Sequence, residues 1–330
     1  MSVTTAKEMR VVRLAAIPSK GLAAVSRTAL DRPLTNCAEL VVGVPSDEAL
    51  ILGSMQRFSE VALAGIEPTM LVTRRGSGGA EVNIGPGTVW IQLALSSPSV
   101  LVPCEPDRLI NRYVRPLLKA ITKVGAVAHY FDRDWVSACG SPVAAVSFGH
   151  DTTTGRAVVE AFVSVTTPFS VRHRASFLGK SPRTLRELRV HHEVDAPRLA
   201  DAIIDAYTAA YGIGELSLDT ASEMTVSLAK NFANGAPDDP RNDPAWTATC
   251  EEAIGLLGAG RDRTGRMRIG GELMASRDVM ARLEEEIAAS GGNAAKLDHA
   301  VDMLAAPGVA MLGVRSLRSL RSLLDTVLRD

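Results

Sequence analysis

Two short glycine-rich segments contain the residues best suited to binding an anionic ligand. Glycine lets a backbone approach a ligand closely, exposed peptide N–H groups bind carboxylate or phosphate oxygens, and guanidinium groups add fixed positive charge. The pattern indicates an acyl or nucleotide cradle, although composition alone favours two ordinary glycine-rich turns. Neither the Rossmann nor the Walker phosphate motif is matched. The candidate ligand-binding residues are Arg74, Arg75, Ser77, Gly78, Gly79, Gly85 and Gly87.

Histidine and cysteine residues give weaker signals. His150 lies in a predicted turn, where hydrogen bonding within the turn is preferred over a role as catalytic base. His191 and His192 fall in a predicted strand, residues 188–194, so their rings face opposite sides and cannot bind one metal ion. The cysteines lack metal-ligand spacing and are expected to be reduced thiols. They are Cys37, Cys104, Cys139 and Cys250.

The composition is that of a folded globular protein. Hydrophobic residues make up 46% of the 330 residues and charged residues 22%. With 36 Lys and Arg against 37 Asp and Glu, the formal charge is -1, which argues against nucleic acid or an anionic membrane as a partner. The first 21 residues contain no continuous apolar run of the length of a signal or membrane-spanning segment. A cytoplasmic location is expected.

The larger first part of the chain alternates short β-type runs with helical stretches. Strands are expected at residues 39–44, 69–73, 88–95 and 157–166, and a helix from residue 107 to about 125. A further helix has Asp195 as its N-cap, Pro197 in its first turn and Gly212 at its end. This pattern predicts an α+β fold, a mixed β-sheet flanked by helices.

Three prolines between residues 234 and 244 interrupt any regular element and mark a linker. We therefore divide the chain into residues 1–233, a linker at 234–245 and a small α+β accessory domain at 246–330. In the accessory domain, strands at 246–257 and 264–269 are expected around a turn at 258–263, followed by two or three helices. The last is amphipathic, and its arginines, Arg315, Arg318 and Arg321, form either a solvated edge or a contact for an acidic partner.

The order of several segments resembles the lipoate–protein ligases and octanoyltransferases of the biotin/lipoate ligase superfamily. The resemblance spans most of the chain, and each motif is weak when taken alone. It adds Gln56 to the candidate ligand-binding residues, and it implies a biotin/lipoate ligase-like fold with a C-terminal accessory domain. The similar segments are Leu52 to Gln56, Arg74 to Gly79, Gly85 to Gly87, Asp134 to Val136, Gly140 to Ala145, Lys180 to Leu188 and Gly265 to Leu273.

The chain departs from the family pattern at three positions. Pro142 stands where the family has the lysine that stabilises charge on the acyl carboxylate and the attacked phosphate. Loss of such a charge costs on the order of a thousandfold in rate. Ile84 replaces a histidine that the glycine-rich loop usually carries, and Ala80 replaces a third glycine. These departures indicate impaired catalysis.

A cysteine could restore catalysis without the lysine, because some octanoyltransferases of the superfamily use a cysteine to form an acyl thioester. Cys139, beside the altered strand, would be nucleophilic if Arg133 or a helix terminus lowered its pKa. A free buried thiol is the preferred interpretation of Cys139. Cys104 raises the same question with less support, and Lys180 is another candidate.

Three functions follow from the resemblance. The first is a catalytically impaired ligase-like protein that acts as an acyl- or nucleotide-binding protein, a regulatory protein or an assembly protein. The second is a divergent lipoate ligase or octanoyl or lipoyl transferase that modifies a carrier-protein lysine, with ATP and magnesium and with lipoate or octanoate as its requirements. The third is a structural partner protein with a closed pocket. A lipoyl-domain or acyl-carrier protein is the expected partner.

Overall fold

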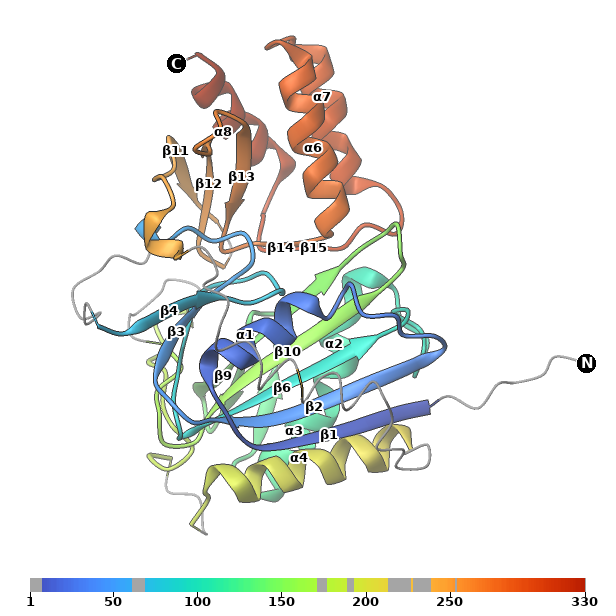
Figure 1. Ribbon diagram of the computed structural model, residues 1–330, viewed down its shortest axis with the longest axis vertical. Coiled ribbons are helices and arrows are strands. Elements are labelled where there is room, and N and C mark those ends of the chain that lie inside the picture. Colours follow the sequence, from blue (N-terminus) through green and yellow to red (C-terminus); the bar gives the residue numbers. More distant parts are fainter. Residues whose placement is uncertain are drawn as a thin grey trace, which may run out of the picture.

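The structure, a computed structural model, describes residues 8–60, 69–170, 177–188, 193–212, 227, 239–252 and 254–329. Its centre is a seven-stranded mixed sheet in the order β1-β2-β6-β10-β9-β8-β7 (Figure 1). β1 runs parallel to β2, and the other neighbours are antiparallel. The strands are β1 (Glu8–Ile17), β2 (Cys37–Pro45), β6 (Thr88–Leu95), β7 (Ala128–Tyr130), β8 (Trp135–Ala138), β9 (Ser141–His150) and β10 (Ala157–Ser164).

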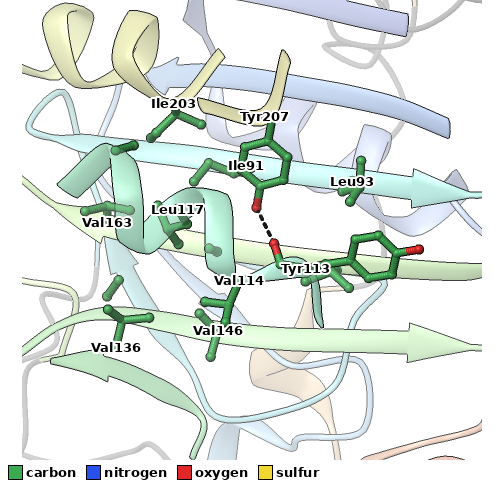
Figure 2. Packing of buried hydrophobic residues seen from close by; sticks show 14 of the residues in the cluster. Ile91, Leu93, Tyr113, Val114, Leu117, Val136, Val146, Val163, Ile203 and Tyr207 are labelled. Carbon is green, nitrogen blue, oxygen red and sulfur yellow. Dashed lines mark hydrogen bonds between the residues drawn. The ribbon is translucent and has the colours of Figure 1, made fainter. Parts of the chain in front are cut away.

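Helices cover one face of this sheet and enclose the largest apolar core. They are α2 (Leu109–Tyr113), α3 (Arg115–Lys123) and α4 (Ala196–Tyr211), preceded by a 3-10 turn at Pro106–Arg108. Figure 2 shows Ile203 and Tyr207 of α4 facing Leu117 of α3 above the sheet. The Tyr207 hydroxyl donates to the carbonyl of Tyr113 at 2.8 Å, which gives this buried phenol its partner.

The opposite face carries α1 (Ser19–Thr28) and a second sheet in the order β4-β3-β5 (Figure 1). A separate aromatic cluster, which includes Trp90, Phe162 and Trp135, fills the space beneath them. The strands of the second sheet are β3 (Ala49–Leu52), β4 (Leu71–Arg74) and β5 (Val82–Ile84), and a 3-10 turn spans Phe58–Glu60. The glycine-rich segment of residues 76–79 is the connection between β4 and β5.

The C-terminal part has a core of its own and sits on the edge of the first part (Figure 1). Three helices cover a three-stranded sheet, and β14 pairs with β15 at the junction. The elements are 3-10 turns at Pro240–Asn242 and Met303–Ala305, β11 (Ala248–Glu251), β12 (Leu256–Arg261), β13 (Met267–Gly271), β14 (Met274–Ala275), α6 (Arg277–Ser290), α7 (Ala294–Asp302), β15 (Met311–Leu312) and α8 (Leu317–Arg329).

The predicted α+β fold is confirmed, and α4 follows its sequence signals closely. Asp195 accepts a hydrogen bond from the Arg198 amide, and Gly212 ends the helix. The helix predicted from residue 107 to 125 is broken into α2 and α3. Pro116 cannot donate to the carbonyl of Arg112, and the Tyr211 hydroxyl lies 3.4 Å from that oxygen instead.

The predicted strand boundaries in the accessory domain are wrong. Gly255, with φ 145°, precedes β12, so that residues 246–257 contain all of β11 and the start of β12. Most of the segment 258–263, expected to be a turn, lies in β12. The glycines of this strand let the indole of Trp246 pack on the sheet, since a Cβ on Gly258 would lie 2.4 Å from that ring. Part of the linker and His191–His192 lie outside the described residues.

The described residues contain neither a membrane-spanning helix nor a cluster of metal-ligating side chains. No helix there is both long and apolar enough to cross a bilayer. No group of three or more histidine, cysteine, aspartate or glutamate residues is arranged there to hold a metal ion.

Truncation of Ile203, which is fully buried in α4, tests the helical layer. Ile203→Ala should lower the free energy of unfolding by about 2 to 5 kcal/mol, because it removes buried apolar contacts and leaves a cavity. Urea denaturation followed by circular dichroism measures this loss. On the same helix, Asp205→Ala serves as control, since that carboxylate forms an exposed pair with Lys123 and its loss should change stability by at most about 0.5 kcal/mol. Equal effects of the two substitutions would contradict the assigned core.

Candidate functional site

Arg75 and Ala80, which flank the glycine loop of residues 76–79, border a cavity that is nearly filled by protein side chains. Its volume is about 10 Å³, which is too small for an acyl chain or a nucleotide. Phe169 and Phe177 occupy one side, with their ring centroids 5.9 Å apart, and Arg75 occupies another. Trp135 packs edge-on against Phe177 at 6.1 Å. Together these side chains leave a cavity too small for a ligand of that size.

Arg75 is directed into its own loop. Its Nε donates to the Ser77 hydroxyl at 3.0 Å, and Nη1 donates to the carbonyl of Ile51 at 3.3 Å. Nη2 donates to the carbonyls of Gly78 at 2.6 Å and Ala80 at 2.8 Å. The side chain is only 2% exposed. Because its donors bind protein oxygens, Arg75 holds the loop rather than presenting a charge to solvent.

Backbone amides of the loop are also bonded within the protein. The amide of Arg75 donates to Leu52, that of Gly76 to the Ser26 hydroxyl, and that of Gly78 to Phe148, over distances of 2.8 to 3.0 Å. The amide of Gly79 donates to the carbonyl of Leu273 at 2.9 Å. These four N–H groups are therefore not available to a carboxylate or phosphate in this conformation.

The small size of Gly78 serves the contact with the accessory domain. A Cβ at this position would lie 2.6 Å from the carbonyl oxygen of Leu273 and 2.8 Å from Cα of Met274. At Gly79, where φ is 86°, a Cβ would lie 3.0 Å from the Met274 methyl group. Close backbone approach, which the sequence assigns to a ligand, is used here by residues 273–274.

Gly85 and Gly87 form a separate turn between β5 and β6. The Thr88 amide donates to the carbonyl of Gly85 at 2.8 Å, and the amides of Val165 and Thr166 donate to that of Gly87, each at 2.9 Å. Neither glycine borders the small cavity. The turn therefore holds residues 165–166, which follow β10. It does not form a common site with the glycine loop.

Gln56 and Arg74 line an open cleft of about 500 Å³ between the two parts of the molecule. Arg74 donates to the carbonyl of Gln56 at 2.7 Å and pairs with Asp243 at 2.6 Å. The Gln56 side chain is buried and donates to Glu81 at 2.6 Å. Arg57 lies over the Trp246 ring, 3.6 Å from its centroid. Thus the side chain of Arg74 lies at the open cleft, whereas that of Arg75 is buried against the glycine loop.

Cys139 is exposed in the turn between β8 and β9, and the expectation of a buried thiol is wrong. Residues 133 and 139 flank β8 at opposite ends, so Arg133 is not beside the thiol.

Pro142 lies in β9, opposite Ser137 at an irregularity in the strand pairing, where a proline is tolerated. Ile84 is fully buried in the aromatic cluster. Cys139 and Pro142 do not line the small cavity.

The remaining candidates are placed as follows. The Lys180 ammonium lies 5.7 Å from the centroid of Trp135, next to the aromatic side chains that fill the cavity. Burial raises the pKa of Cys104 to about 11, which disfavours a thiolate. His150 lies at the junction of the two parts, with Nδ1 2.8 Å from the Ser276 hydroxyl.

A buried polar network around Glu160 was not predicted from the sequence. Glu160 is fully buried in β10, where its carboxylate accepts hydrogen bonds from Trp90 Nε1 at 3.1 Å and Gln92 Nε2 at 3.2 Å. It also accepts from the hydroxyls of Ser26 at 2.9 Å and Ser77. A charged residue inside the apolar run 157–163 was the available signal, but its donors come from three distant segments.

Comparison with solved structures identifies the fold. LipL1 of P. falciparum in complex with lipoate aligns over 98% of this chain and 100% of its own, with a TM-score of 0.63 and 11% identity. A bipartite lipoate protein ligase from Thermoplasma acidophilum, solved with its E2 lipoyl domain, aligns over 73% and 100%, with a TM-score of 0.55 and 15% identity. The chain has the lipoate–protein ligase fold.

A lipoate–protein ligase A bound with ATP aligns over 71% of this chain and 98% of its own, with a TM-score of 0.52 and 15% identity. No protein-family profile and no curated sequence matches the chain. At these identities the lipoate ligase likeness concerns the arrangement of elements. The chemistry must be argued from the residues of this chain.

Substitution of Gly78 tests the contact between the glycine loop and the accessory domain. Gly78→Ala should destabilise the protein by about 1 to 3 kcal/mol and raise the amide exchange rate of Gly79, because the new methyl group overlaps backbone atoms of residues 273–274. Denaturation and hydrogen exchange measure both effects. Gly85→Ala is the matched control, since its nearest neighbours are side-chain atoms of Thr167 and Glu48 at 3.2 and 3.3 Å. Unchanged exchange at Gly79 would contradict this role.

Neutralisation of Glu160 tests the buried network. Glu160→Gln should cost about 2 to 3 kcal/mol of stability, because an amide N–H₂ would replace an acceptor oxygen. The Ser26 and Ser77 hydroxyls already accept from the Gly76 amide and Arg75 Nε, and they would lose their own acceptor. Denaturation midpoints are compared with those of Glu48→Gln, a change at an exposed glutamate. A stable Glu160→Gln protein would show that the network does not need the charge.

Proposed function

We propose that this protein is catalytically inactive and acts by binding a protein partner, using the lipoate–protein ligase fold as its framework. The observation that carries the proposal is the cavity of about 10 Å³ at the glycine loop, filled by Arg75, Phe169 and Phe177. A ligase or an acyl-binding protein needs space there for a substrate. The filled cavity favours a partner-binding protein over one that holds an acyl chain or a nucleotide.

Two further observations support loss of catalysis. Pro142 carries no charge where the family resemblance places a lysine, so developing negative charge would lack that stabilisation. The bonded amides of Arg75, Gly76, Gly78 and Gly79 cannot replace it, because each already has an acceptor inside the protein. The lysine charge expected from the resemblance is thus absent at residue 142, and these four amides do not supply N–H donors in its place.

A lipoyl-domain or acyl-carrier protein is the proposed partner. This proposal is supported by one similar structure, that of a ligase with its E2 lipoyl domain. Binding without modification would then serve regulation or assembly. The described surface offers exposed apolar side chains at Val127, Phe131 and Leu178, which are suited to protein contact.

A divergent acyltransferase is the second candidate, and the position of Lys180 favours it. Its ammonium lies over Trp135, and Trp135 packs on Phe177 at the cavity. A movement of these aromatic rings would bring a cation to the opened cavity. ATP and magnesium with lipoate or octanoate would be required only for this function.

Intact-mass spectrometry separates these functions. The protein is mixed with lipoate or octanoate, ATP and magnesium, or with octanoyl carrier protein, and with an unmodified lipoyl domain. We expect no change in the mass of the lipoyl domain and no ligand retained in native spectra, but saturable binding of the carrier domain in a parallel titration. Pro142→Lys should leave activity absent, because the added ammonium does not open the cavity.

Other outcomes would assign another function. Modification of the lipoyl domain, or an acyl adduct that Cys139→Ser removes, would establish divergent catalysis. Ligand retention without turnover would establish an acyl- or nucleotide-binding protein. Absence of carrier-domain binding would overturn the proposed partner.

A further inference from the structure

A second cavity of about 500 Å³, open to solvent like the cleft beside Arg74, lies at the junction of the two parts and shares no lining residue with the glycine loop. Its walls are mostly apolar. Pro98 and Pro106 line it from the first part, and Val279, Met303 and Val309 line it from the accessory domain. This volume lies within the range of small-molecule sites, which are typically apolar with a few placed polar groups.

His150 provides one of these polar groups. The residue is 2% exposed, and its Nδ1 is committed to the Ser276 hydroxyl at 2.8 Å. Ser276 is held in turn by the amide of Ala310, which donates to its hydroxyl oxygen at 2.9 Å. Within the described part of the chain, Nε2 of this cavity-lining ring has no hydrogen-bond partner. Burial lowers the pKa of His150, so the ring offers a neutral polar atom to the cavity.

Arg282, on the exposed side of α6, provides a positive charge beside the same cavity. Its guanidinium contacts the Met303 sulfur at 4.0 Å, and no carboxylate lies within salt-bridge distance of it among the described residues. Arg277, earlier on the same helix, differs because it pairs with Asp31 and Asp151, each at 2.9 Å. Arg282 therefore has its charge available to a ligand.

The open cleft beside Arg74 does not have this combination. Arg74 pairs there with Asp243, and Arg268 pairs with Asp262 and Glu284. The guanidinium of Arg263, also in that cleft, donates to the carbonyl of Asn242. The cavity at His150 instead combines mostly apolar walls, a buried ring nitrogen and an arginine that has no carboxylate within salt-bridge distance among the described residues. This combination fits a molecule with an apolar body and one anionic end.

We propose that the cavity at His150 binds a small amphipathic carboxylate. The apolar body lies against Pro98, Pro106 and Met303, the carboxylate accepts hydrogen bonds from Arg282, and His150 Nε2 contacts a polar atom of the ligand. Because the walls come from both parts of the molecule, the ligand joins the first domain to the accessory domain. This site is independent of the proposed partner binding and of the glycine loop.

Calorimetric titration of the full chain with 4-phenylbutyrate tests the site. We expect one equivalent to bind, and the uncharged 4-phenylbutyramide to bind at least about tenfold more weakly, because it lacks the charge-assisted hydrogen bonds of a carboxylate. Arg282→Gln should weaken carboxylate binding by the same factor and leave amide binding unchanged. Arg318→Gln, at an exposed arginine of α8, is the matched control and should change neither.

Filling the cavity provides an independent variant. Ala306 lines it, is exposed and has an extended backbone with φ -67° and ψ 147°, so Ala306→Phe should fold and occupy ligand space. It should abolish binding of both compounds. Carboxylate binding that survives both Arg282→Gln and Ala306→Phe would place it elsewhere and overturn the proposal. Equal affinity for carboxylate and amide, or no binding of 4-phenylbutyrate at millimolar concentration, would also overturn it.

Discussion

The buried carboxylate of Glu160 is the interaction on which the arrangement around the glycine loop depends. A charge removed from water is tolerated only when hydrogen bonds replace its hydration, and here donors come from α1, β6 and the glycine loop. Each donor has to be in place for the carboxylate to be satisfied. Glu160 therefore fixes α1 against the sheet and Ser77 against β10.

The position of Ser77 determines how the rest of the loop is held. Its hydroxyl accepts from Arg75 Nε and lies 2.8 Å from the Ser147 hydroxyl, while the other nitrogens of Arg75 bind carbonyls on both sides of the loop. With its shape set in this way, the loop presents Gly78 and Gly79 to residues 273–274. A continuous series of hydrogen bonds thus connects the centre of the sheet with the accessory domain.

The sequence predicts those parts of the fold that depend on local chemistry. Asp195 and Gly212 define α4 because a cap is recognisable within a few residues, and the strands at 88–95 and 157–164 follow from their apolar, β-branched runs. Residues 258–261 were wrongly expected to form a turn, because their glycines are there to let Trp246 pack on Gly258 and Gly270, a contact that residue types alone do not indicate.

The candidate site was harder to predict, since glycine and arginine suit a ligand and a neighbouring segment equally well. Gly78 permits close approach of any backbone or phosphate, and Arg75 donates equally to a carboxylate or to carbonyls. Which occupant is present depends on distant residues such as Leu273, Phe169 and Phe177. Motif order therefore identified the lipoate ligase fold, while the occupant of the loop required the folded chain.

The substituted positions and the closed cavity are physically consistent with one another. A lysine at residue 142 would place an ammonium at a buried position of β9 opposite Ser137, where burial disfavours a charge. A histidine at residue 84 would bring a polar ring into the cluster that contains Trp90 and Phe162. Pro142 and Ile84 avoid both costs. In this arrangement, apolar residues at positions 84 and 142 are therefore less costly than the polar and charged residues that the family resemblance places there.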